Sequence, residues 1–390
     1  MFMFDRDIDF VTPLLTQLTY EGSIDEHFNI ESGSVKLPSS ITGSSTTGSS
    51  GPMSTVILNA KDPTFESIRS KHFAGVSSHL VRKAKEIQLA KENSKSMSAA
   101  EMKKFVADEL KELQNQQLGI ALHLSIYESI TKAAKIGFER QLSIEHGLVT
   151  GTTSFSDART FFEDLCARRA PVTQCLRLLC LMSLTQSNGL SLTDYHKFQK
   201  DFLYCHGFDL LPAMEACRSA GLLIINSDSP QYGAINPIHA VKGLRQAASN
   251  IISREKINNF PSLIKALKLV PDQDVDVDLH NPSDLSYVFN GAFTPVIPKI
   301  VLKSLTARDL SSVTDALRLA PGATVCEGWS SREGEDEGGS MVLVVILGGV
   351  TYAELAALKL VALSTGKRIV VASTDTVSGN KIVLDSLGEY

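Results

Sequence analysis

The sequence has no long apolar run, only one tryptophan, and six cysteines. Its most apolar segment, Met341 to Val350, is shorter than the roughly 20 residues that a membrane-spanning helix needs. Charges begin at Asp5, so no signal peptide is expected. No Cys-x-x-Cys pair occurs, and the cysteines are expected to be buried thiols of a reducing compartment. These absences favour a cytoplasmic protein without a membrane span.

Composition and charge narrow the class further. The 390 residues are 43% hydrophobic and 21% charged, which is usual for a globular protein, and two or three domains are expected. The net charge of −5 argues against a nucleic-acid partner. The histidines are scattered, and no metal-ligand or nucleophile–base pattern emerges. No cofactor is therefore expected.

Low-complexity stretches indicate how the chain is organised. Residues 39–54 and 330–340 are rich in serine and glycine and are expected to be flexible surface inserts. They separate a partial parallel α/β region, residues 1–34 with 282–390, from a large, mainly helical region, residues 35–281. The expected fold class is therefore α/β plus α.

The α/β region shows strand patterns at both ends of the chain. The apolar run Met1 to Phe4 predicts a strand, and no earlier strand precedes it in the sequence. A βαβ unit is predicted from a strand at Met341–Leu347, a helix started by a capping box at Thr351 and Glu354, and a strand at Arg368–Ser373. Because a parallel strand is normally buried between neighbours, the sequence is expected to begin inside a domain.

The helical region begins with long helices. Asp62-Pro63 predicts a helix start, and apolar residues at three- and four-residue spacing extend that helix to about Glu92. A capping box at Ser98 and Glu101 starts a second helix, and a third is expected from about Leu118 to Ile136. A short polar loop joins the first two, so a projecting helical hairpin is predicted.

A compact set of helices follows over residues 156–225. Their ends are predicted before Pro171 and at Gly189, Gly207 and Gly221, because glycine commonly ends helices. The apolar run after Gly221 reads as a strand. Helices followed by a strand resemble a winged helix, but Arg177, Lys197, Lys200 and Arg218 are balanced by Asp194, Asp201, Asp209 and Glu215. A neutral surface is poorly suited to DNA.

Several ordered segments resemble the Sec/Munc (SM) family, and specifically its vacuolar and endosomal branch. The N-terminal one is Asp5-Arg6 followed by Asp9-Phe10 and Thr12-Pro13-Leu14, with Gln17-Leu18-Thr19-Tyr20-Glu21-Gly22 after it. The others are Asn59-Ala60-Lys61-Asp62, Arg177 to Leu181, His206-Gly207-Phe208, Ser219 to Leu223, Asn281 to Val288, and Leu347 to Glu354. The resemblance covers nearly the whole chain.

The resemblance implies a function. SM proteins are non-enzymatic regulators of SNARE-mediated membrane fusion, and this branch serves in the HOPS and CORVET tethering complexes at endosomes, lysosomes and vacuoles. The implied partners are syntaxin-like and R-type SNAREs and a scaffold subunit of the tethering complex, which would provide peripheral membrane association. It also implies that the chain is truncated at its N-terminus, since a first domain and the opening strands of the second are absent.

Two other readings remain open. Asp7 and Asp9 follow a short strand, as in haloacid-dehalogenase-like phosphotransferases, where such carboxylates act as nucleophile and acid/base. The further acidic ligands of such sites are absent, so an ion-paired loop of Asp5, Arg6 and Asp9 is favoured. The remaining alternative is a winged-helix scaffold protein without SNARE contact.

Two groups of residues are candidate contact sites. Residues 61–111 hold 11 Lys/Arg against 7 Asp/Glu, and the SNARE-contact candidates are Arg82, Lys83, Lys85, Lys103 and Lys104. A merely solvated basic face is the alternative. The scaffold-contact candidates are Lys200, Phe208 and Leu211. Phe208 and Leu211 lie one turn apart, where they would either staple a helix start onto the core or form an exposed anchor.

Overall fold

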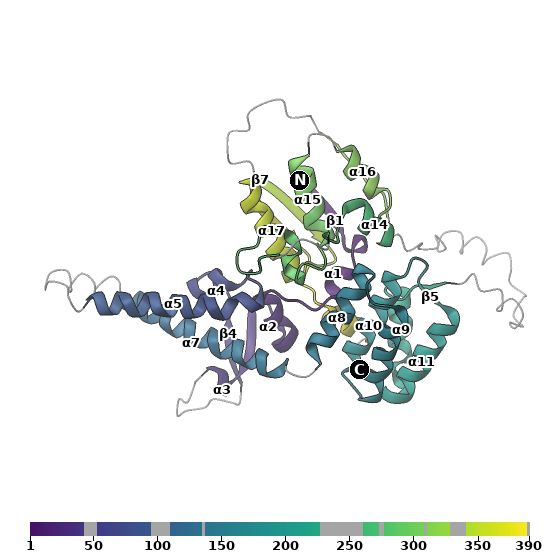
Figure 1. Cartoon of the computed structure of the whole chain (residues 1–390), viewed down its shortest axis with the longest axis horizontal. Helices are drawn as coiled ribbons and strands as arrows, with labels where there is room; N and C mark the ends of the chain where they lie inside the picture. Colours follow the sequence, from purple (N-terminus) through teal and green to yellow (C-terminus); the bar gives the residue numbers. More distant parts are fainter. Residues whose placement is uncertain are drawn as a thin grey trace, which may run out of the picture.

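The computed structural model describes residues 1–42, 53–94, 110–134, 137–226, 260–272, 277–307, 310–327 and 341–387. Within these ranges a small parallel α/β part sits above a larger helical part, and a pair of long helices projects to one side (Figure 1). The predicted class, α/β plus α, is confirmed. None of the helices in these ranges combines the length and apolar character needed to cross a bilayer.

The α/β part contains a three-stranded parallel sheet in the order β1-β7-β8. Its strands are β1 (Phe2–Asp5), β7 (Met341–Leu347) and β8 (Arg368–Ser373). Helix α17 (Tyr352–Thr365) connects β7 to β8, and its capping box between Thr351 and Glu354 is complete. The predicted βαβ unit is therefore confirmed. The surrounding elements are η1 (Arg6–Ile8), η3 (Leu285–Phe289), α14 (Phe260–Leu267), α15 (Val296–Thr306), α16 (Ser311–Leu317) and α18 (Gly379–Leu387).

The two faces of this sheet differ in burial. Val342, Val344 and Ile346 of β7 point to a covered face and are at most 8% exposed. On the opposite face Met3 is 61% and Val370 is 37% exposed. Parallel sheets are usually covered on both faces. The second face is thus an apolar surface left open by the described residues.

A second sheet was not anticipated. It is antiparallel, in the order β2 (Ile30–Glu31), β3 (Ser34–Pro38) and β4 (Met53–Ile57), and the short helix α3 (Ser39–Thr42) follows β3. The two ends of the expected flexible insert over 39–54 are structured, since α3 begins at Ser39 and Met53 and Ser54 pair with Pro38 and Leu37. The intervening residues 43–52, and the second insert at 330–340, lie outside the described residues.

The projecting helices are α5 (Phe73–Ser94) and α7 (Leu110–Ala133), with α4 (Pro63–Ile68) at their base (Figure 1). The projecting pair of long helices is present as predicted, but most of the expected loop at 93–97 lies outside the described residues. The single helix from Asp62 to Glu92 is broken between α4 and α5. The start of α2 (Tyr20–Phe28) docks at this break, where the N–H groups of Tyr20 and Glu21 donate to the carbonyls of Lys71 (2.9 Å) and Arg69 (3.1 Å). A tertiary contact thus overrides the helical periodicity.

The third helix is also longer than predicted. Helix α7 begins at Leu110 and continues through Leu118, where the sequence suggested a start. No glycine or proline breaks the stretch before Gly119, and that glycine packs against the side chain of Thr64. The capping box at Ser98 and Glu101 lies outside the described residues.

The compact helical bundle matches its prediction closely. Its helices are α8 (Phe138–Thr150), α9 (Phe155–Ala167), α10 (Val172–Thr185), α11 (Leu192–His206) and α12 (Leu211–Ser219). Helix ends fall before Pro171, Gly189, Gly207 and Gly221, as predicted, and η2 (Phe208–Leu210) links α11 to α12. The expected strand after Gly221 is short: β6 (Ile225–Asn226) pairs in parallel with β5 (Leu190–Ser191).

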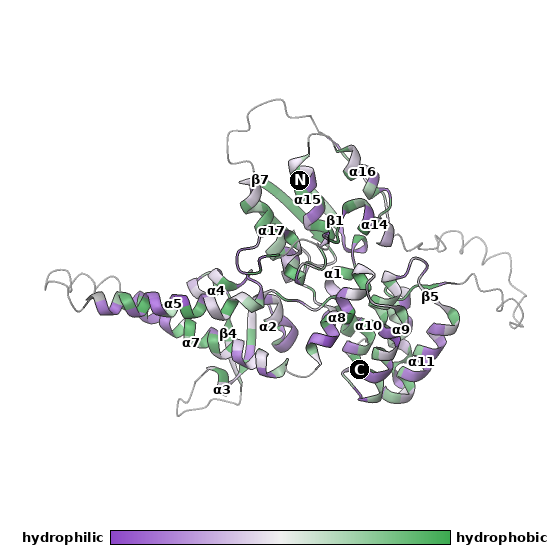
Figure 2. Cartoon of the chain, in the orientation of Figure 1, coloured by the Kyte–Doolittle hydropathy of each residue, from purple (hydrophilic) through white to green (hydrophobic). Residues whose placement is uncertain are grey.

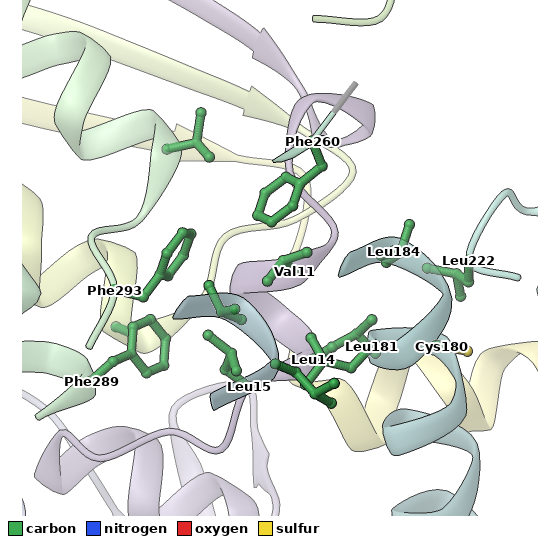
Figure 3. Packing of buried hydrophobic residues seen from close by; sticks show 14 of the residues in the cluster. Val11, Leu14, Leu15, Cys180, Leu181, Leu184, Leu222, Phe260, Phe289 and Phe293 are labelled. Carbon is green, nitrogen blue, oxygen red and sulfur yellow. The ribbon is translucent and has the colours of Figure 1, made fainter. Parts of the chain in front are cut away.

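Two hydrophobic cores hold these elements. Figure 3 shows the larger one, in which Val11 and Leu14 of α1 (Val11–Leu14) lie between Phe293 and the bundle residues Leu181 and Leu184. The smaller core joins α2, the antiparallel sheet, α4, α5 and α7. Helix α2 belongs to the smaller core, and the helical bundle shares the larger core with the parallel sheet. The expected domain boundaries at residues 34 and 281 therefore remain a proposal.

A buried arginine ties distant segments together at the centre. Arg177 of α10 pairs with Glu26 of α2 at 2.7 Å and donates to the Asn380 side chain of α18 at 3.0 Å. It also donates to the carbonyl of Leu14 at 3.1 Å. A Cβ on Gly379 would lie 2.4 Å from Nε of Arg177, so α18 approaches this group through a glycine. Helices α1, α2, α10 and α18 therefore meet at one guanidinium group.

Candidate functional site

The first candidate surface lies on the projecting helices. They run antiparallel, since Phe73 at the start of α5 stacks on Tyr127 near the end of α7 with ring centroids 4.6 Å apart. Leu80 and Ile87 of α5 and Ile126 of α7 belong to the smaller core and are at most 7% exposed. Each helix thus has one buried face, and apolar and polar residues alternate along both helices (Figure 2). Among the described residues, no other element covers the outer faces of α5 and α7.

A polar network fixes the base of this helical pair. Nε2 of the buried His123 on α7 lies 3.0 Å from a carboxylate oxygen of Asp62, and its Nδ1 lies 2.9 Å from the hydroxyl of Tyr20. Asp62 also caps α4 by accepting from the N–H groups of Thr64 (2.8 Å) and Phe65 (3.1 Å). Burial acts to raise the pKa of Asp62, but the hydrogen bonds from His123 and Phe65 outweigh it and lower that pKa. Helices α2, α4 and α7 are therefore locked together.

An apolar and basic stripe lies along the outer face of α5. Val81 is 48% and Leu89 is 57% exposed, and Lys85 lies between them at four-residue spacing. Leu118 of α7 adds a side chain that is 70% exposed. We call Val81, Lys85 and Leu89 the α5 stripe. Apolar side chains at helical spacing beside a positive charge suit an amphipathic partner helix with acidic residues.

The predicted basic residues of this surface differ in their surroundings. Arg82 and Lys83 both approach Glu86, at 4.0 and 3.0 Å, so one carboxylate offsets part of their charge. Lys85 is exposed and makes no ion pair with a described residue. Lys103 and Lys104 lie outside the described residues. Val81 and Leu89 were not predicted from the sequence, although their spacing around Lys85 could have revealed them.

The second candidate surface is the corner between α11 and α12. Gly207 ends α11 with φ of 116°, a conformation that favours glycine. The chain then turns so that Phe208 is 65% and Leu211 46% exposed, which excludes the core-staple reading of Phe208. Tyr204, 68% exposed, meets Phe208 edge-on at 5.7 Å, and Nζ of Lys200 lies 5.7 Å from the Tyr204 ring centroid.

We call Lys200, Tyr204, Phe208 and Leu211 the corner patch. Tyr204 was missed at the level of sequence, although Lys200, Tyr204 and Phe208 are four residues apart and the first two share one face of α11. Two exposed aromatic rings in contact are unusual for a monomer surface and are frequent at the centres of interfaces. The patch therefore has the character of a protein-binding site.

The charge balance of the winged-helix-like bundle changes with the structure. Arg177 is 6% exposed and bound to Glu26, so it does not contribute to the surface as the sequence count assumed. Of the four acidic residues counted before, Asp194 pairs with Arg159. Lys197, Lys200 and Arg218 then stand against Asp201, Asp209 and Glu215. This surface has no excess of positive charge, which disfavours DNA.

Asp7 and Asp9, the two aspartates of the phosphotransferase hypothesis, have different surroundings. Asp9 is 1% exposed, and its carboxylate accepts from the Thr12 N–H (2.9 Å), the Thr12 hydroxyl and the Val296 N–H (3.3 Å). Burial raises the pKa of Asp9, and Arg6 nearby opposes that shift. Asp7 is exposed. No cluster of three potential metal-binding side chains occurs among the residues that the structure describes.

Arg6 completes the structural role of this loop. It forms a two-pronged pair with Glu354 of the capping box, at 2.8 and 2.9 Å, and approaches Asp9 at 4.0 Å. A Cβ on Gly348 would lie 2.6 Å from Cβ of Arg6, which explains the glycine at this turn. The predicted ion-paired loop is thus present for Arg6 and Asp9, while Asp5 caps η1 by accepting from the Asp7 N–H at 3.0 Å. The loop joins β1 to the start of α17.

This combination of a partial parallel sheet, a projecting helical pair and a compact helical bundle belongs to a known class. The sequence model of the Sec1 family matches residues 1–385, and the chain is therefore a member of the Sec1 family. The SM resemblance stated from the motifs is confirmed.

Curated relatives narrow the branch. Vacuolar protein sorting-associated protein 33B of Danio rerio is 33% identical over 396 residues, covering 98% of this chain and 62% of that protein. The Homo sapiens protein of the same name is 32% identical over 398 residues, covering 100% of this chain and 63% of the relative. Vacuolar protein sorting-associated protein 33 of Schizosaccharomyces pombe is 29% identical over 367 residues, covering 91% of this chain and 57% of that protein. The chain spans less than two thirds of each relative.

Solved structures agree on the fold. The Unc18–syntaxin 1 complex from Monosiga brevicollis contains a chain with a TM-score of 0.63 at 17% identity, covering 99% of this chain and 60% of that one. Sly1p, solved with an N-terminal peptide of Sed5p, gives a TM-score of 0.57 at 15% identity, and the match covers 99% of this chain and 58% of Sly1p. At these identities the likeness shows the fold alone.

Proposed function

We propose that this chain is an SM-type regulator of SNARE-mediated membrane fusion, without enzymatic activity, in vesicle transport to endosomes, lysosomes or vacuoles. Its relatives are named for vacuolar protein sorting, and one fold neighbour was solved as a complex with syntaxin 1. The observation that carries the proposal is the α5 stripe on a projecting helical pair. It offers apolar contacts to a helix that lies along it.

The proposed mechanism is templating. Helices of syntaxin-like and R-type SNAREs lie along α5 and α7, with apolar residues against Val81 and Leu89 and acidic residues near Lys85. The locked base at His123 and Asp62 keeps this surface rigid, so less conformational freedom is lost on binding. Arg82 and Lys83 steer the encounter, as do Lys103 and Lys104, because rim charges act mainly on association rates.

The α5 stripe can be tested directly. We expect Val81→Asp combined with Leu89→Asp to weaken binding of isolated SNARE-motif helices at least about tenfold, since charges would replace two apolar contacts. Fluorescence anisotropy with labelled SNARE motifs measures the affinity. Val325→Asp combined with Leu363→Asp, at residues that are 77% and 75% exposed and belong to other elements, is the matched control.

The outcomes separate the competing functions. Unchanged SNARE affinity in the double variant would reject the stripe as the contact site. A wild-type chain that binds no SNARE motif but still binds tethering-complex subunits would favour the winged-helix scaffold alternative. Phosphatase turnover with magnesium that Asp7→Asn abolishes would revive the phosphotransferase reading, which Asp9 disfavours through its burial and its bonds to Thr12.

The corner patch is proposed as the contact for a scaffold subunit of the HOPS or CORVET core. Phe208 and Leu211 would enter an apolar pocket of that subunit, and Lys200 would lie at the rim. Binding through this corner leaves the α5 stripe free. The tethering complex would then bring the chain, as a cytoplasmic protein, to endosomal, vacuolar or lysosomal membranes, and no nucleic-acid partner is proposed.

A further inference from the structure

Four lysines form a basic surface on the α/β part. Lys265 and Lys268 lie at the end of α14, and Lys299 and Lys303 lie one turn apart on α15. The two helices pack together, because the Phe260 and Phe293 rings are 6.1 Å apart and the Thr294 N–H donates to the Leu269 carbonyl at 2.8 Å. We call these four residues the lysine patch.

The charges of the lysine patch are close together, and no carboxylate of the described residues forms an ion pair with them. Burial lowers the pKa of Lys303, and the positive charges of Lys299 and Lys268 lower it further. None of the four ammonium groups pairs with a carboxylate in the described ranges. Lysines elsewhere do pair, as Lys197 does with Glu163 and Lys359 with Glu66. In a chain of net charge −5, this local excess of positive charge can attract an external anion.

The surroundings of the patch indicate which kind of anion. No large apolar side chain of α14 or α15 is exposed, so the described surface lacks the anchors on which protein interfaces depend. Lysine is a flexible, strongly hydrated point charge rather than a planar fork for one phosphate. A diffuse negative surface, such as an anionic lipid leaflet, attracts such groups by charge alone.

We propose that the lysine patch binds the anionic leaflet of a membrane directly. This goes beyond the proposed function, in which partners alone provide membrane association. Each lysine near such a surface contributes roughly fivefold to binding, so the four together contribute several hundred-fold. The patch lies on a different side of the molecule from the projecting helices (Figure 1), and a chain bound through it would keep the α5 stripe accessible.

Vesicle flotation of the full chain tests the proposal, because aggregates sink while lipid-bound protein rises. We expect the chain to float with phosphatidylcholine vesicles containing phosphatidylserine, to stay behind with pure phosphatidylcholine, and to be released by about 0.5 M salt. Replacing all four lysines by glutamine should remove several hundred-fold of the affinity for the anionic vesicles. The double variant Lys265→Gln/Lys268→Gln should lose roughly 25-fold.

The matched control changes the net charge equally at another surface. Lys61→Gln, Lys83→Gln, Lys85→Gln and Lys111→Gln lie on or near the projecting helices and should leave flotation nearly unchanged. Equal loss in this control would overturn the patch in favour of a general charge effect. Absence of flotation in the wild type, or equal flotation with uncharged vesicles, would overturn it as well. If the fourfold variant unfolds, the double variant decides.

Discussion

His72 is a single residue whose burial makes stability depend on pH. It is 5% exposed, and its Nδ1 accepts a hydrogen bond from the Ala74 N–H at 3.2 Å. Burial lowers its pKa from 6.5 to about 4, and burial does the same to His146. Between these two pH values the unfolded chain binds more protons than the folded one. The stabilising effect of a neutral His72 is therefore complete above pH 6.5 and is lost as the pH falls toward 4.

We expect His72→Asn to reduce this pH dependence. Asparagine keeps an acceptor for the Ala74 N–H but cannot be protonated. For the wild type, His72 alone should cost about 2 kcal/mol of unfolding free energy between pH 7.5 and pH 5. Urea unfolding of both proteins at the two pH values measures the difference, in which the opposite contribution of buried carboxylates such as Glu145 cancels. If both proteins lose the same unfolding free energy between pH 7.5 and pH 5, His72 is not the titrating group.

At the scale of elements, the turn between α11 and α12 carries an exposed side chain that should matter for binding rather than for folding. Phe208 contacts Tyr204 but is 65% exposed, so replacing it should affect a partner more than the core. We expect Phe208→Asp to weaken binding of the scaffold subunit roughly 30-fold or more while SNARE binding persists. Co-purification measures the binding, and far-UV circular dichroism measures helix content.

Leu384→Asp on α18 is the control for the corner patch, since Leu384 is 50% exposed but belongs to another element. It should leave scaffold binding intact. Loss of helix content in Phe208→Asp would instead mean that Phe208 supports the fold and that the site assignment is wrong.

Elements with local signals were predictable from the sequence. Glycine and proline positions predicted the ends of α9 to α12, and the capping box at Thr351 and Glu354 predicted α17. The break between α4 and α5 was not predictable, because it depends on hydrogen bonds from Tyr20 and Glu21, far away in the sequence. Strand β4 was also missed, because its short run is preceded by serines and glycines.

The candidate sites were predictable only in part. Lys85 was found through the local excess of Lys and Arg, and Phe208 through the resemblance and its position one turn before Leu211. Whether a helix face is exposed depends on the packing of other helices. For this reason Arg177 was counted as a surface charge although Glu26 and α18 enclose it.

At the scale of the whole molecule, the open face of the parallel sheet should control self-association. Met3 lies on edge strand β1 and is 61% exposed, and Val370 of β8 lies on the same face of the sheet. Exposed apolar edges promote aggregation. We expect the isolated chain to be poorly soluble without a co-expressed partner, and Met3→Lys with Val370→Lys to increase its monomeric fraction.

Sedimentation velocity measures that fraction. Leu118→Lys, at a residue that is 70% exposed on α7, is the control and should help much less. A wild-type chain that is monomeric and unfolds cooperatively on its own would contradict the expectation, because the open sheet face would then not cause self-association.

The pairing of β1 with β7 also affects how this protein is made on the ribosome. Arg6 bonds to Gly349 across 343 residues, and among the described strands β1 pairs only with β7. At 5–20 residues per second, translation reaches β7 roughly 20 to 70 s after β1 emerges. Helix α18, which closes over Arg177, comes later still. During that interval the nascent chain carries the apolar strand β1 without its β7 partner, and chaperones that shield apolar strands should be needed until β7 has been made.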